Sequence, residues 1–156
     1  MRNLIMCLTF TSFVLTGCAT IPPKAVTYEQ KQRVYNFNFD TTWSKISELI
    51  SKENLPIKAI DKNSGIINTD FVQTSLDQVD KGNFLGLGIL VKARYTLSFF
   101  VTQIDETHTK VIINSHIEHF GSQNEWVSTF NVDDSFLPNK YFKKLNELFS
   151  DASAGL

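Results

Sequence analysis

The sequence predicts a two-layer α+β domain, in which two helices cover one face of a single antiparallel sheet of about five to six strands. Apolar and polar residues alternate in several short segments, which is the pattern of half-buried strands. Two other segments repeat apolar residues every three or four positions, which is the pattern of amphipathic helices. The two longest strands are separated by too few residues for a crossover helix, so they are expected to be antiparallel.

The first strand and the first helix are expected between residues 34 and 52. Tyr35, Phe37 and Phe39 alternate with Val34, Asn36 and Asn38, which predicts a strand with an aromatic inner face. Asp40 follows as the expected N-cap of a helix over residues 41–52. The apolar stripe of this helix consists of Trp43, Ile46, Leu49 and Ile50, and Asn54 and Pro56 end it.

The remaining segments complete the predicted order β-α-β-β-β-β-β-α. Asn63-Ser64-Gly65 predicts a turn between two paired strands, and residues 105–108 predict the turn of a later hairpin. Pro138 suits the first turn of a closing helix. The expected strands cover residues 57–61, 66–72, 91–101, 111–117 and 126–132, and the closing helix covers residues 139–150.

The first seventeen residues have the three parts of a secretory signal. Arg2 supplies a positive charge, residues 4–15 form an apolar run too short to span a bilayer, and Leu15-Thr16-Gly17-Cys18 follows. This last motif resembles the lipobox of bacterial lipoproteins. The resemblance implies cleavage between Gly17 and Cys18 and lipidation of Cys18. Since Ala19 rather than Asp comes next, it also favours the outer membrane in a Gram-negative source.

The expected organisation is a signal peptide over residues 1–17, the lipidated Cys18 with a tether over 18–33, one periplasmic domain over 34–150, and a flexible tail over 151–156. Processing leaves 156 minus 17, or 139, residues, which suffice for one domain. It removes Cys7, and lipidation consumes Cys18, so no thiol remains for a disulfide. Losing Arg2 changes the formal net charge from −1 to −2, which argues against electrostatic binding of nucleic acid.

The histidines and carboxylates form no pattern that predicts catalysis. Strand alternation places His116 and Glu118 on the outer face of one expected strand, while His119 points inward or ends the strand. One imidazole and one carboxylate are too few for a zinc site. The chain also lacks the Gly-x-Ser-x-Gly motif of a serine nucleophile. We therefore expect no catalytic residue, no metal site, no cofactor and no enzymatic activity.

The segment over residues 73–90 interrupts the strand pattern and carries glycine-spaced apolar residues. Phe84, Leu85 and Leu87 are predicted partner contacts, because apolar side chains on a long loop often mark an interface. Trp126 is a further predicted contact, since it follows a polar loop over residues 121–125. The alternative interpretation is that these side chains pack onto the core.

Three motifs after the first strand resemble the helix-grip domain of BamC-type lipoproteins, the accessory lipoproteins of the outer-membrane β-barrel assembly machinery. They are Trp43 at the start of a helix, Asp61 before a turn, and Gly65-Ile66-Ile67-x-Thr69 in the return strand. The resemblance covers about residues 34–150 and implies a curved sheet that wraps the closing helix.

The anchor and this resemblance together lead to the expected function, a non-catalytic protein-binding accessory module of an envelope assembly. The alternative is a protein that binds lipid or another apolar ligand in a helix-grip cavity, with residues 84–90 as its lid.

Overall fold

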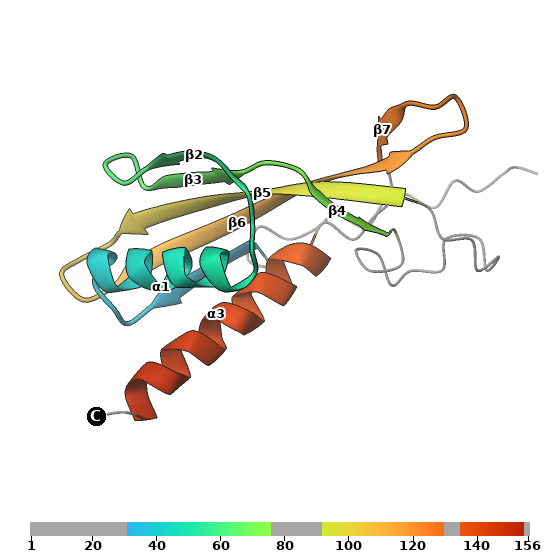
Figure 1. Cartoon of the computed structure of the whole chain (residues 1–156). Helices are drawn as coiled ribbons and strands as arrows, with labels where there is room; N and C mark the ends of the chain where they lie inside the picture. Colours follow the sequence, from blue (N-terminus) through green and yellow to red (C-terminus); the bar gives the residue numbers. More distant parts are fainter. Residues whose placement is uncertain (1–30, 76–91, 130–134, 155–156) are drawn as a thin grey trace, which may run out of the picture.

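A long hairpin of β5 (Lys92–Gln103) and β6 (Thr109–Phe120) forms the centre of the fold (Figure 1). The structure is a computed structural model and describes residues 31–75, 92–129 and 135–154. The other elements of the described part are β1 (Gln32–Tyr35), α1 (Phe39–Lys52), β2 (Ile57–Asp61), β3 (Ile66–Thr69), β4 (Val72–Ser75), β7 (Trp126–Ser128) and α3 (Phe136–Ala154).

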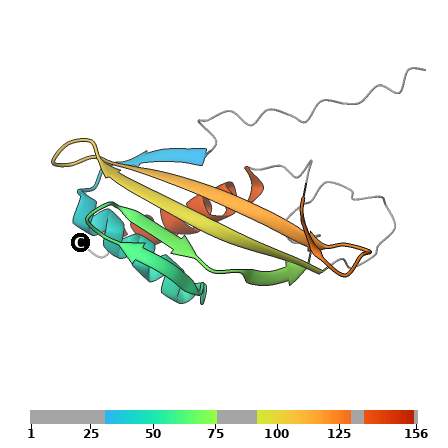
Figure 2. The same cartoon turned by 90° about the horizontal axis from the view of Figure 1, so that it is seen from above.

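Different strands flank the β5–β6 hairpin at its two ends. At the turn end of the hairpin the strand order is β1-β6-β5-β3-β2. At the opposite end β4 pairs with β5 and β7 pairs with β6, so the strand order there is β4-β5-β6-β7 (Figure 2). All described pairings are antiparallel, and β5 and β6 are in continuous register from Ala93↔His119 to Gln103↔Thr109.

Both helices lie against the same face of the sheet, which confirms the predicted α+β fold class (Figure 1). Odd-numbered residues of β5 and β6 point toward the helices, and Leu97, Phe99 and Ile113 are completely buried there. From α3 the buried stripe includes Leu137, Tyr141, Phe142, Leu145 and Phe149. The ring of Phe149 stacks on both Tyr35 and Phe37, with centroids 4.5 Å and 4.6 Å away, so the closing helix is held against β1 and the residues after it.

The first strand and the first helix both begin two residues earlier than predicted, at Gln32 and Phe39. β1 ends at Tyr35, and Phe37 and Phe39 are not in a strand. Asn38, not Asp40, is the N-cap of α1, because its Oδ1 atom accepts the Thr41 N–H at 2.9 Å. The predicted end of the helix is confirmed, since Asn54 adopts a left-handed φ of 51° directly after the C-cap Glu53.

The predicted strand over residues 66–72 is two strands, so the described part of the chain has a sheet of seven strands rather than five or six. The Asp70 N–H donates to the Pro56 carbonyl at 2.7 Å, and the Leu97 N–H donates to the side-chain Oγ1 of Thr69 at 2.9 Å. These bonds replace the backbone ladder to β5, so the chain leaves β5 after β3 and pairs with it again as β4.

The C-terminal helix is longer than predicted. It starts at Phe136, three residues before the expected start, and it extends to Ala154, within the expected tail. The buried side chains of Leu137 and Pro138 explain the early start. Of the expected strand over residues 126–132, the structure shows β7, and residues 130–132 lie outside the described residues.

Candidate binding surface

The face of the sheet opposite the helices, here called the open face, is covered by no described helix (Figure 1). Even-numbered residues of β5 and β6 point to it. Ile66, Phe100 and Ile112 are register neighbours on β3, β5 and β6 and form an apolar row across this face. All three are only partly buried. At the edge of the same face, Val34 on β1 is 55% exposed.

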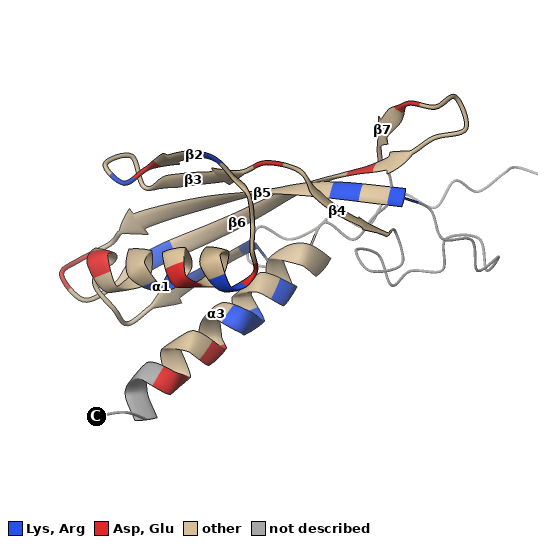
Figure 3. Ribbon diagram, in the orientation of Figure 1, with Lys and Arg blue, Asp and Glu red and all other residues tan. Residues whose placement is uncertain are grey.

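The apolar row is bordered by uncharged polar residues. Asn68, Ser98 and Asn114 form the next row along the hairpin. Lys110 lies two residues from Ile112 on β6, and Lys92 lies at the far end of β5, where blue marks the first residues of that strand in Figure 3. An apolar centre with a weakly charged border is the composition of many protein–protein interfaces.

The far end of the open face carries a cluster of five side chains, here called the Arg94 cluster. The guanidinium carbon of Arg94 lies 3.9 Å from the ring centroid of Phe71 and 4.2 Å from that of Trp126. Its Nε and Nη2 atoms both lie 2.6 Å from Oε2 of Glu118. The fifth member is His116, whose Nε2 lies 3.2 Å from the other carboxylate oxygen of Glu118.

The Arg94 cluster joins all four strands at this end of the sheet. Phe71 immediately precedes β4, Arg94 is on β5, Glu118 is on β6, and Trp126 begins β7. A guanidinium on an aromatic face contributes about 0.5–2 kcal/mol, depending on how far it is removed from water. The side chains of Arg94 and Glu118 are 22% and 16% exposed, so solvent screens their contact only in part.

Two opposing effects set the pKa of Glu118. Burial of the carboxyl group raises its pKa, but hydrogen bonds from Arg94 and His116 and the positive charge of these side chains lower it. The net effect is a pKa below the ordinary value of 4.5, so the carboxylate is ionised at neutral pH. Glu118 is therefore an anchored anion in the cluster and is not a candidate general acid.

The structure separates the histidines as predicted. His116 and Glu118 are on the open face, whereas His119 points to the helix side, where its Nδ1 lies 3.1 Å from the Thr129 hydroxyl. Glu118 is more enclosed than expected for a solvated side chain, because Arg94 covers it. Within residues 31–75, 92–129 and 135–154, no three His, Cys, Asp or Glu side chains gather closely enough to hold a metal ion.

The predicted partner contacts fall at the same end of the sheet or outside the described part. Trp126 belongs to the Arg94 cluster, and its ring also packs edge-on against Phe120, with centroids 5.4 Å apart. Phe84, Leu85 and Leu87, like Gly17 and Cys18, lie outside the described residues. The segment that contains Phe84 follows Ser75 and precedes Lys92, which are paired beside the cluster.

Sequence reasoning missed Arg94, Phe71 and the apolar row. The apolar row had a signal, since Phe99-Phe100 and Ile112-Ile113 each place an apolar residue at an outward position of an alternating strand. The Arg94 cluster had no such signal, because its members come together only through the pairing of β4 and β7 with the hairpin.

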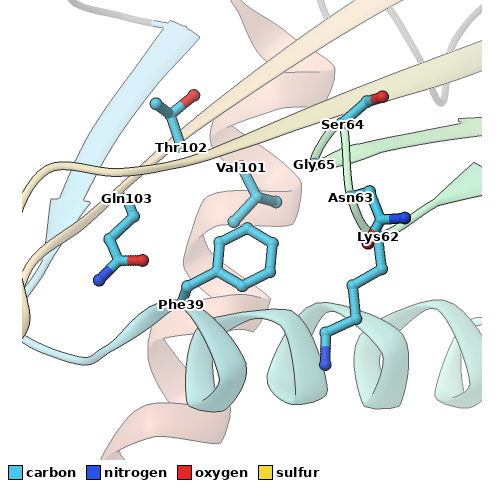
Figure 4. A pocket seen from close by; sticks show the side chains of 8 residues that line it. All are labelled: Phe39, Lys62, Asn63, Ser64, Gly65, Val101, Thr102 and Gln103. Atoms are coloured by element: carbon cyan, nitrogen blue, oxygen red, sulfur yellow. The ribbon is translucent and has the colours of Figure 1, made fainter.

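A hollow of about 550 Å³ lies between the β2–β3 turn, the end of β5 and the start of α1 (Figure 4). The ring of Phe39 points toward Val101 inside it, and Lys62 extends over it to an ion pair with Asp40 at 2.8 Å. Both charged side chains are more than half exposed, so this ion pair contributes little stability. The hollow opens to solvent at the edge of the sheet and does not lie beneath α3.

A helix-grip cavity would lie between α3 and the sheet, where the structure has packed side chains. Tyr95 and Tyr141 meet there with their hydroxyl oxygens 2.7 Å apart, and both are at least 95% buried. Burial raises the pKa of both phenols, so both hydroxyl groups are neutral, and one donates a hydrogen bond to the other. A ligand in this place would have to displace that hydrogen bond and the neighbouring Phe142 and Leu145.

Comparison with known proteins does not place the chain in a family. No protein-family model matches it, and no curated protein matches it. Among solved structures, it is similar to a DUF4468 family protein from Bacteroides ovatus, with 8% sequence identity and a TM-score of 0.40 over 79% of this chain and 82% of that chain. None of the helices in the described part is both long enough and apolar enough to cross a membrane.

Proposed function

We propose that this chain is an outer-membrane lipoprotein, anchored through Cys18, whose periplasmic domain is a non-catalytic, protein-binding accessory module of an envelope assembly. Support for the anchor comes from Leu15-Thr16-Gly17-Cys18 directly after a signal-like apolar run. Support for binding comes from the open face. The proposal assigns the chain neither a substrate nor a cofactor.

The apolar row is the observation that carries the binding proposal. Ile66, Phe100 and Ile112 lie side by side on a face that no helix of the described residues covers. A sheet in a two-layer fold normally places polar residues at such outward positions. A partner that covers apolar side chains there removes them from water, which stabilises the complex by about 25 cal/mol per Å² of apolar area buried.

Site-specific photo-crosslinking in cells tests this proposal. A photoreactive phenylalanine analogue at Ile112 should give a discrete adduct with another envelope protein at the native level of expression. The matched control places the same analogue at Lys143, an exposed position of α3 on the other side of the molecule. An absence of adducts at Ile112, or equal adducts at both positions, would refute a binding role for the open face.

A further inference from the structure

The open face of the β5–β6 hairpin must be recognised through its side chains. At the turn end, β6 pairs with β1 and β5 pairs with β3. At the far end they pair with β7 and β4. The backbone groups of both hairpin ends are therefore already bonded, and an added strand has no edge to join there. An α-helix satisfies its own backbone, so it is the element that suits such a face.

Two apolar regions lie at opposite ends of this face. The first is the apolar row at Ile112, and the second is the pair Phe120 and Trp126. Ile112 and Phe120 are eight positions apart on β6, which is about 26 Å at 3.3 Å per residue. A helix covers that length with about 17 residues, and its diameter of about 10 Å covers two strands spaced about 4.8 Å apart.

On the hairpin itself, the charges that are left without an opposite charge are positive. Glu118 on β6 is paired with Arg94. Asp61 keeps its negative charge, because its hydrogen bonds come from the neutral amides of Asn63 and Ser64 and the Ser64 hydroxyl, but it lies on β2, off the hairpin. Within the described part of the chain, Lys92 and Lys110 form no ion pair. They lie at the two ends of the hairpin, each beside one of the apolar regions.

We propose that the open face of the hairpin binds an amphipathic helix of a partner protein, which has apolar side chains at both ends of a stretch of about 17 residues and acidic side chains beside them. This inference rests on the proposed function and specifies the partner of that same face. Acidic flanks would meet Lys92 and Lys110, and the uncharged middle of the helix would lie over Ser98 and Asn114.

Synthetic helical peptides provide the test. The first peptide has leucines in its first and last turns, 17 residues apart, with adjacent glutamates. The second has lysines in place of the glutamates, and the third brings the leucines to half the spacing. Binding to the full-length lipidated chain in phosphatidylcholine nanodiscs is measured by fluorescence anisotropy, with empty nanodiscs as the blank. We expect the first peptide to bind about tenfold more tightly than either of the others.

Variants of the chain locate the binding. Lys110→Glu should weaken binding of the glutamate peptide about tenfold and strengthen that of the lysine peptide. Lys143→Glu on α3 makes the same charge change away from the open face and should alter neither. Ile112→Thr should weaken binding severalfold. Ile60→Thr on β2 should not, because Ile60 is also exposed but its register partner Ile67 is buried on the helix side of the sheet.

Equal affinity for the three peptides, or an unchanged affinity in Lys110→Glu, would overturn the inference. So would a preference of the open face for vesicles with phosphatidylglycerol, or for a second copy of the chain in analytical ultracentrifugation. Crosslinking at Ile112 in cells separates the two levels of the proposal. If Ile112 captures a partner but the three peptides bind equally, the proposed function stands and the inference that the partner supplies a helix is refuted. If Ile112 captures no partner, the proposed function itself fails.

Discussion

Arg94 links the two short strands at the far end of the sheet to the central hairpin. Arg94→Ala removes both ring contacts and leaves the Glu118 carboxylate without its main partner, so we expect the free energy of unfolding to fall by about 2 kcal/mol. Arg94→Lys keeps the charge but loses the planar contacts, and should cost about 1 kcal/mol. Urea denaturation followed by circular dichroism measures both values. Lys92→Ala, an exposed change on the same strand, is the control, and an equal loss there would contradict this role for Arg94.

The pKa of Glu118 predicts how acid acts on this cluster. The folded state lowers this pKa below 4.5, so the unfolded state binds the proton more readily. The contribution of Glu118 to stability is therefore complete well above pH 4.5 and is lost as the pH falls through the lower folded-state value. Glu118→Gln should be less stable than the wild type at pH 7, and the difference should shrink in acid. Urea midpoints measured from pH 7 to pH 3 report this difference.

A second acid-sensitive group requires a control for that experiment. In the β5–β6 turn, Asp105 accepts the backbone N–H of Thr107 and a bond from His108, which lowers its pKa to about 2. The wild type and Glu118→Gln share this group, so it cancels in their difference. Glu125→Gln changes an exposed carboxyl group outside the cluster and should follow the wild-type curve. A constant gap between the wild type and Glu118→Gln at every pH would contradict the assigned pKa.

At the level of elements, substitutions at the start of α1 distinguish the observed N-cap, Asn38, from the predicted one, Asp40. Asn38→Ala removes the acceptor for the Thr41 N–H and should cost about 1 kcal/mol of stability. Asp40→Ala removes only an exposed ion pair with Lys62 and a helix-end charge, so it should cost less than about 0.5 kcal/mol. Thermal unfolding of the two variants ranks the residues, and the reverse order would restore Asp40 as the cap.

The β2–β3 turn depends on Gly65. Its φ is +69°, and a Cβ atom there would lie 2.0 Å from the carbonyl oxygen of Val101, which is fixed in β5. Gly65→Ala should therefore cost more than about 2 kcal/mol or reduce the yield of folded protein. At Gly121 an added Cβ would lie 3.2 Å from a side-chain methyl of Val127 and 3.5 Å from the Glu125 carbonyl oxygen, so Gly121→Ala should be mild. Soluble yield and urea midpoints measure the effect, and equal behaviour of both variants would count against the clash.

At the level of the whole molecule, periodicity predicted the layers and most strands, because burial on one side imposes it. The bounds of β2 were predicted to the residue, since Asp61 and Gly65 mark its end and the following turn. The split between β3 and β4 was not predicted, because it depends on a hydrogen bond to the Pro56 carbonyl and on one from the Leu97 N–H, and both residues lie far from the split in the sequence. Open-face contacts depend on strand register in the same way, which explains why the Arg94 cluster was missed.

Anchoring is a property of the whole chain, and Cys18 is the residue on which the prediction depends. Acyl chains stabilise membrane attachment by about 0.8 kcal/mol per buried CH₂ group, so two or more chains hold a protein firmly. Cys18→Ala should abolish incorporation of an alkyne-labelled fatty acid and release the chain from the membrane fraction after a high-salt wash. Cys7→Ala should change neither, because Cys7 lies in the expected signal segment. Label retained in Cys18→Ala would contradict lipidation at this residue. Label lost without release would mean that another part of the chain binds the membrane, and crosslinking at Ile112 would then show whether the open face is that part.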